Sequence, residues 1–239
     1  MRVTSLFYLL VVSCLAVLQL PCAAQRRIAA DVEIKQVAAG RSTTVTKTVY
    51  CSRDGRLVTD FHKPVNYITA IGPRGEGTMY MPSTGEYVNM PAGDVISARD
   101  NLLSLYLSGQ LSDFGLTRHG YVIADAVTEP EGYVRKVFRN DNSLRNGGIN
   151  RVDIVYDQRY LPVYFEYFSS GGALARKVYL SHYITRQGVT MPLRMTGIEY
   201  NGADSTIVRT LYSNIRIDQD DPMFDFTLPA DAKPAERPK

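Results

Sequence analysis

The stretch that decides the fold is residues 55–90, GRLVTDFHKPVNYITAIGPRGEGTMYMPSTGEYVNM. Bulky apolar residues recur along it, and short turns rich in Gly, Pro, Asn and Ser interrupt them. Such runs are typical of consecutive antiparallel strands joined by tight turns. The pair Lys63-Pro64 marks one corner, because proline cannot donate to a sheet ladder and is confined to edges and turns. We therefore expect a β-meander here.

Two further elements are predicted upstream of this meander. Residues 42–50, STTVTKTVY, are β-branched almost throughout and predict a strand. Asp54-Gly55, which follows it, is a hairpin signal. Residues 28–39 place apolar side chains among good helix formers, and this spacing predicts a short amphipathic helix that ends at Gly40.

Downstream of the meander, residues 94–107 change to a helical pattern. Ser97 and Asp100 are candidate caps at its start. The apolar face, widened by Leu105, consists of Leu102, Leu103, Tyr106 and Leu107. This is the one strongly helical segment expected between two strand-rich halves.

Alternating polar and apolar residues return in the second half of the chain. Gly188 and Asn201-Gly202 mark bends between the runs. The strands expected here are residues 133–138, 150–156, 163–167, 177–185, 191–200 and 206–217. The second half is therefore predicted to be a second meander.

The N-terminus has the pattern of a secretory signal peptide. Residues 1–24 combine a basic start, an apolar block and small residues at the exit, so cleavage after Ala24 is expected. A retained membrane anchor is the alternative, and lipidation at Cys14 or Cys22 is a further one. Cleavage would leave Cys51 as the sole cysteine, which excludes an internal disulfide in the mature chain.

Composition bounds the rest of the interpretation. The chain has 239 residues, 45% of them hydrophobic, with 16 Tyr and no Trp, and this is typical of a β-rich globular domain. A net charge of +3 argues against a nucleic-acid partner, which usually requires a basic stripe. We expect one domain over residues 25–232 and a disordered Pro- and charge-rich tail over residues 233–239.

Several of these features, taken in order, resemble the LolA-type outer-membrane lipoprotein carriers. The resemblance spans roughly residues 41–232, and no single motif in it is specific. The residues that carry it are Gly55, Lys63-Pro64, Tyr80-Met81-Pro82, Asp157, Leu161-Pro162, Val189-Thr190-Met191-Pro192 and Phe224-x-Phe226-x-x-Pro229. It implies a mainly β fold with a few helices (α+β): a strongly curved, incomplete antiparallel β-barrel with a helical lid over an apolar cavity.

The resemblance also implies a function. It points to a monomeric periplasmic carrier that binds the acyl chains of lipoproteins. Such a carrier takes cargo from an inner-membrane lipoprotein-releasing ABC transporter and passes it to an outer-membrane acceptor. A lipid-sensing interaction module and a membrane-anchored acceptor on the same scaffold remain alternatives.

The cavity and lid expected from the resemblance and the apolar pattern involve many side chains, and core packing is the alternative for each. The expected residues are Phe61, Ile68, Leu102, Leu103, Tyr106, Leu107, Ile154, Tyr156, Val163, Phe165, Tyr167, Leu193, Met195, Phe224 and Phe226. The family commonly has an arginine four residues after the corner proline, where it holds the lid shut. Ile68 stands at that position here, so the lid needs other contacts.

Enzymatic patterns are weak in this sequence. His62, His119 and His182 are scattered without the spacing of metal ligands, and no Gly-x-Ser-x-Gly elbow occurs. The aspartates of residues 218–221 lack the glycine and distal glutamate of a calcium loop and predict a solvated turn. Cys51 has no obvious basic partner. We expect no catalytic residues, metal or cofactor.

Overall fold

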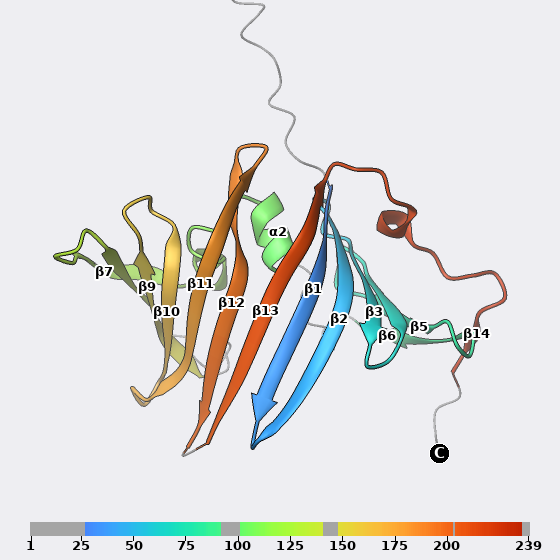
Figure 1. Ribbon diagram of the computed structural model, residues 1–239, viewed down its shortest axis with the longest axis horizontal. Helices are drawn as coiled ribbons and strands as arrows, with labels where there is room; N and C mark the ends of the chain where they lie inside the picture. Colours follow the sequence, from blue (N-terminus) through green and yellow to red (C-terminus); the bar gives the residue numbers. More distant parts are fainter. Residues whose placement is uncertain (1–26, 92–100, 141–147, 203, 236–239) are drawn as a thin grey trace, which may run out of the picture.

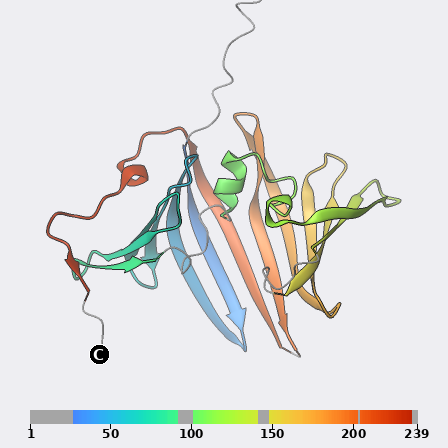
Figure 2. The ribbon, with the colours of Figure 1, turned by 180° about the vertical axis from the view of Figure 1, so that it is seen from behind.

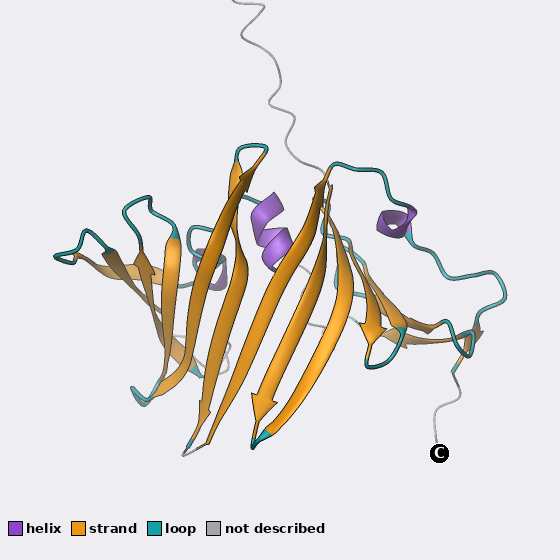
Figure 3. Cartoon of the chain, viewed as in Figure 1, coloured by secondary structure: helices purple, strands orange, loops and turns teal. Residues whose placement is uncertain are grey.

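The computed structural model describes residues 27–91, 101–140, 148–202 and 204–235 (Figure 1). The expected signal peptide, the cysteines Cys14 and Cys22, and the expected caps Ser97 and Asp100 lie outside these residues. The described chain forms mostly strands (Figure 3). Its one α-helix among the described residues is α2 (Leu102–Leu107), and short 3-10 turns, η2 (Thr117–His119) and η4 (Pro222–Asp225), accompany it.

All the strands belong to one sheet of 14 strands with open edges. Its spatial order is β14-β6-β5-β4-β3-β2-β1-β13-β12-β11-β10-β9-β8-β7. The strands are β1 (Arg27–Ala38), β2 (Arg41–Ser52), β3 (Leu57–Lys63), β4 (Tyr67–Ile71), β5 (Gly77–Met81), β6 (Glu86–Met90), β7 (Val122–Thr128), β8 (Val134–Arg139), β9 (Ile149–Tyr156), β10 (Pro162–Ser169), β11 (Leu174–Arg186), β12 (Val189–Asn201), β13 (Asp204–Ile217) and β14 (Lys233–Pro234).

Two antiparallel meanders build this sheet, and they meet at the β1–β13 pair. The first runs from β1 outward to β6, and the second returns from the far edge, β7, inward to β13. Ile28 pairs with Ile217 and Ala38 with Thr206, so this seam joins the first strand of one meander to the last strand of the other along nearly their whole length. The expected mainly β, curved and open sheet is confirmed (Figure 1).

The connection between the meanders explains why α2 lies against the sheet. Because β6 is near one edge and β7 forms the other, the intervening chain has to cross a face of the sheet. Figure 2 shows α2 on that face, and both ends of the sheet curl toward it. We call this the inner face and the opposite side the outer face.

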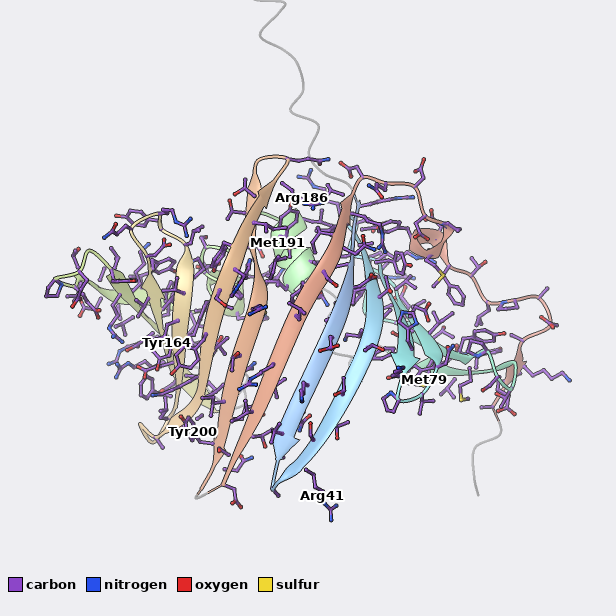
Figure 4. All side chains as sticks on the ribbon, viewed as in Figure 1. Arg41, Met79, Tyr164, Arg186, Met191 and Tyr200 are labelled. Atoms are coloured by element: carbon purple, nitrogen blue, oxygen red, sulfur yellow. The ribbon has the colours of Figure 1, made fainter. Side chains whose placement is uncertain are left out.

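Burial follows a gradient along the long central strands. β2 is exposed at Arg41 and buried by Cys51, and β1 shows the reverse gradient from Ile28 to Val37. Figure 4 labels Arg41 at the end of β2 far from α2, and Arg186 at the end of β11 nearest α2. The sheet is therefore closed over by α2 at one end and open at the other.

Three strands differ from what the sequence analysis expected. Residues 28–38 of the expected helix form most of strand β1 instead, because pairing with β2 on one side and β13 on the other outweighs local helix propensity. β7 was not predicted. Part of the expected disordered tail forms β14, where the Lys233 N–H donates to the Gly85 carbonyl at 2.9 Å.

Turn chemistry, in contrast, follows the sequence. The Asp54-Gly55 hairpin joins β2 to β3, and the Gly55 N–H donates to the Ser52 carbonyl at 3.0 Å. Gly55 adopts a φ of 96°, in the left-handed region that glycine enters without a Cβ clash. This hairpin sets the register that points Leu57 toward the inner face.

Candidate functional site

A hollow of about 740 Å³ lies on the inner face beside α2. Its size falls in the range of about 300–1,000 Å³ that is usual for small-molecule sites. Most of its lining is apolar, and none of the described residues that line it is acidic. The lining residues are Ile34, Lys47, Leu57, Thr59, Phe61, Tyr67, Thr69, Ile71, Met79, Met90, Asn101, Leu102, Leu105, Phe114, Arg176, Met195 and Tyr212.

Helix α2 divides its apolar side chains between the hollow and the core. Asn101 caps the helix, its Oδ1 accepting from the Leu103 N–H at 2.9 Å. Leu102 and Leu105 line the hollow, while Leu103 is fully buried against the inner face. The helix is therefore anchored by one part of its surface and presents another to the hollow.

Strands β3, β4 and β5 form one wall of the hollow. Leu57, Thr59 and Phe61 alternate along β3 and share the inner face, as the period of two requires. The ring of Phe61 stacks on that of Tyr67 in β4, with centroids 4.2 Å apart. This part of the meander, which decides the fold, also supplies the apolar wall.

Two cations line the hollow. Lys47 projects from β2, its Nζ 5.0 Å from the centre of the Phe61 ring, and burial lowers the pKa of its ammonium group. Arg176 projects from β11 and lies 3.8 Å from Glu199. Tyr212 faces the same hollow, and burial raises the pKa of its hydroxyl, which therefore stays neutral.

The structure brings three of the expected cavity residues to this hollow: Phe61, Leu102 and Met195. Others fill the adjoining core of the inner face. Leu103, Tyr106 and Leu107 belong to the cluster under α2, with Leu193 packed against it, and Ile154, Tyr156 and Phe165 form a second cluster, with Tyr167 packed against that one. Val163 is half-buried at a register shift in β10.

Three expected residues lie on the outer face instead. Phe224 packs with Tyr50 there, and Ile68 and Phe226 contact the same cluster. The physical reason is that successive side chains of a strand point to opposite faces of the sheet. Tyr50 in β2 and Val58 in β3 therefore face outward, while the residues next to them in each strand face inward. An arginine at position 68 would therefore point away from α2.

Residues that the sequence interpretation missed could have been found from the same alternation. Counting back from Phe61 by twos gives Thr59 and Leu57, both of which line the hollow. In β2 the same rule puts Lys47 on the apolar face that carries Val49. A lysine within an apolar strand face was the signal for the charged part of the lining.

The described part of the molecule has other hollows. One of about 570 Å³ lies between β4–β6 and the C-terminal segment, and its lining includes the charged side chains of Arg56 and Glu76. Within the described ranges, no three His, Cys, Asp or Glu side chains come together as a metal site. No helix in the described part of the chain is long and apolar enough to cross a membrane.

Comparisons with known proteins identify the fold. No family model matches the chain, and no curated protein matches its sequence. Solved structures do match. A LolA superfamily protein from Nitrosomonas europaea aligns with a TM-score of 0.57 at 15% identity, over 85% of this chain and 90% of that chain.

Two further structures align similarly. A DUF1329 family protein from Desulfovibrio piger has a TM-score of 0.57 at 15% identity, over 88% of this chain and 94% of that one. An outer membrane lipoprotein-sorting protein domain from Vibrio parahaemolyticus has a TM-score of 0.55 at 13% identity, over 84% and 89%. The chain has the fold of the LolA superfamily, and the resemblance drawn from the sequence is confirmed at the level of the fold.

Proposed function

We propose that the protein is an exported, non-enzymatic carrier that binds the acyl chains of lipoproteins in the hollow beside α2. The observation that carries the proposal is an apolar hollow of about 740 Å³ on the inner face of a LolA-type sheet. Each methylene moved from water into it contributes about 0.8 kcal/mol. Several methylenes together outweigh one specific polar contact, so such a site needs few defined side chains.

In this proposal α2 acts as a lid. Its face toward the hollow, Leu102 and Leu105, would contact the bound chain, while its cap at Asn101 keeps the first turn formed. Transfer of the cargo across the periplasm requires only that each successive binding site has a higher affinity for its acyl chains than the one before. An inner-membrane lipoprotein-releasing ABC transporter supplies the cargo and an outer-membrane acceptor receives it, with the carrier acting as a monomer.

The first test is native mass spectrometry of the freshly purified protein, which should show a co-purified acylated species. The Met195→Trp variant should lose that species because the larger side chain fills the hollow. Leu211→Trp is the matched control. Leu211 precedes Tyr212 in β13, but its side chain is 38% exposed and does not line the hollow. If both variants retain the lipid equally, the hollow is not the site.

A lipid-responsive interaction module is the second candidate, and edge strand β7 favours it. All seven residues of β7 are exposed, among them Val122, Ile123 and Val127. An exposed edge offers unpaired backbone groups to a partner strand. A carrier releases its lipid to acceptor membranes, whereas a sensor retains it while contacting its partner. A diacylated Cys14 or Cys22, found by intact mass, would instead support a membrane-anchored acceptor.

A further inference from the structure

Lys47 is an unusual member of a mostly apolar wall. Its neighbours in the hollow include Ile34, Phe61 and Tyr212, and none of the described carboxylates lies within ion-pair distance of its ammonium group. Burial lowers the pKa of Lys47, and no opposite charge of the described chain offsets this shift. The Phe61 ring, 5.0 Å away, offers the ammonium only partial compensation.

Arg176 brings a second cation to the same hollow. Its guanidinium lies across Gly197 in β12, where a Cβ added to the glycine would stand 3.5 Å from Arg176 Nη2. The guanidinium carbon Cζ of Arg176 lies 5.7 Å from the centre of the Tyr167 ring. Its partner Glu199 is 3.8 Å away, and both side chains are nearly half exposed. Such an ion pair is weak and leaves the guanidinium free to bind another anion.

We propose that the hollow takes an acyl chain with an anionic head group, carboxylate or phosphate, and that Lys47 and Arg176 bind that head group. This inference rests on the acyl-chain site of the proposed function and goes beyond it. The acyl chains of a lipoprotein are held in ester and amide linkages without a carboxylate or phosphate, so the additional ligand class is a free fatty acid or a phospholipid. Among the described residues, the lining holds two cations and no acid, so a wholly neutral ligand would leave the Lys47 charge without a described counter-ion among mostly apolar side chains. An anion supplies the missing opposite charge.

The arrangement also orients the ligand. α2 contributes Leu102 and Leu105 at the buried end of the central strands. Arg176 lies near the start of β11, opposite Glu199 in β12. Strand β12 ends at Asn201, and Figure 4 labels the neighbouring Tyr200 at the open end of the sheet. The acyl chain would therefore point toward α2, with its head group between the helix and the open end.

The test compares four amphiphiles with the same chain by isothermal titration calorimetry: dodecanoate, dodecyl phosphate, dodecanol and dodecyltrimethylammonium. The wild-type protein should bind the two anionic ligands about tenfold or more tightly than dodecanol, and the cationic ligand most weakly. Lys47→Gln and Arg176→Gln should each reduce the preference for anions about tenfold while leaving dodecanol binding unchanged. The control is Lys35→Gln, an exposed lysine of β1 outside the hollow, which should change nothing.

The outcomes separate this inference from the proposed function. If wild type binds dodecanol and dodecanoate equally, and neither glutamine variant changes this, the inference is overturned while the carrier proposal stands. Binding of no amphiphile at all overturns both. A preference for anions that survives both variants overturns the assignment to Lys47 and Arg176. The wild-type comparison needs no variant to fold, and the carboxylate and phosphate arms distinguish a free fatty acid from a phospholipid.

Discussion

The hydroxyl of Tyr106 donates a hydrogen bond to the carbonyl oxygen of Arg186 at 3.3 Å, which ties α2 to the hairpin between β11 and β12. The guanidinium of Arg186 in turn donates to the Ile215 carbonyl at 3.0 Å, in β13. Together with the buried leucines of the helix, these contacts hold α2 on the inner face. The residue at position 68 has no part in this, because it faces outward.

Tyr106→Phe tests this attachment. The variant removes the hydroxyl and keeps the ring in the core, so the free energy of unfolding should fall by about 0.5–1.5 kcal/mol. Urea denaturation measures the loss. Tyr133→Phe is the control, since Tyr133 is 38% exposed and should be neutral. Equal stabilities of the two variants would show that the Tyr106 hydroxyl contributes nothing to holding the helix.

Most of the fold could be predicted from the sequence because β-hairpin signals are local. Asp54-Gly55 gives the turn between β2 and β3, and alternation in residues 150–156 gives β9. β1 could not be predicted in this way. Its alanines and charges favour a helix locally, and its strand state comes from β13, whose paired residues lie far along the chain.

The candidate site was less predictable than the fold. Apolarity alone does not distinguish a side chain that lines a hollow, such as Leu102, from its fully buried neighbour Leu103. Apolarity also does not show on which face of the sheet a residue packs when that residue belongs to a segment outside the strands. Phe224 is buried like a core residue, but its partners belong to the outer face because the C-terminal segment crosses that side.

Cys51 should react slowly with iodoacetamide in the folded protein. Burial under α2 raises the pKa of its thiol to about 12, with a small opposing effect from the Ser104 hydroxyl. Near pH 8 the folded chain should therefore hold roughly a thousandfold less thiolate than the unfolded chain, whose thiol has its ordinary pKa. Alkylation followed by mass spectrometry, with and without urea, measures the ratio. Equal rates in both conditions would mean that α2 does not cover the thiol.

The same shift predicts a pH dependence of stability. The folded pKa of Cys51 is raised above the unfolded value of 9.0, so its contribution is fully present below pH 9 and is lost as pH rises toward 12. Relative to Cys51→Ala, the wild type should lose about 1.4 kcal/mol per pH unit in this window. Urea denaturation of both proteins at several alkaline pH values measures the difference. A difference independent of pH would contradict the burial of the thiol.

Asp153 should be the most sensitive carboxylate of the outer face. Its side chain is 2% exposed and accepts from Arg151 Nε at 2.8 Å and Nη2 at 2.5 Å. Asp153→Asn keeps the shape but loses the charge and one acceptor, so stability should fall by about 1.5–3 kcal/mol. Asp204→Asn, at an exposed position, is the control. Equal effects on the urea midpoint would mean that the Asp153–Arg151 pair is not stabilising.

Phe224 and Phe61 provide a paired test of which face holds the ligand. Phe224 is 2% exposed and meets Tyr50 edge to face, with ring centroids 5.4 Å apart, on the outer face. Phe224→Ala should therefore cost about 3–5 kcal/mol of stability and leave the affinity of the folded protein for dodecanoate unchanged.

Phe61→Ala should show the opposite pattern. Phe61 is half-buried and lines the hollow, so its truncation removes contact area for an acyl chain as well as the ring beside Lys47. We expect weaker dodecanoate binding by calorimetry and a smaller loss of stability than for Phe224→Ala. Binding that falls with Phe224→Ala but not with Phe61→Ala would move the ligand to the outer face, because only there does Phe224 have its contacts.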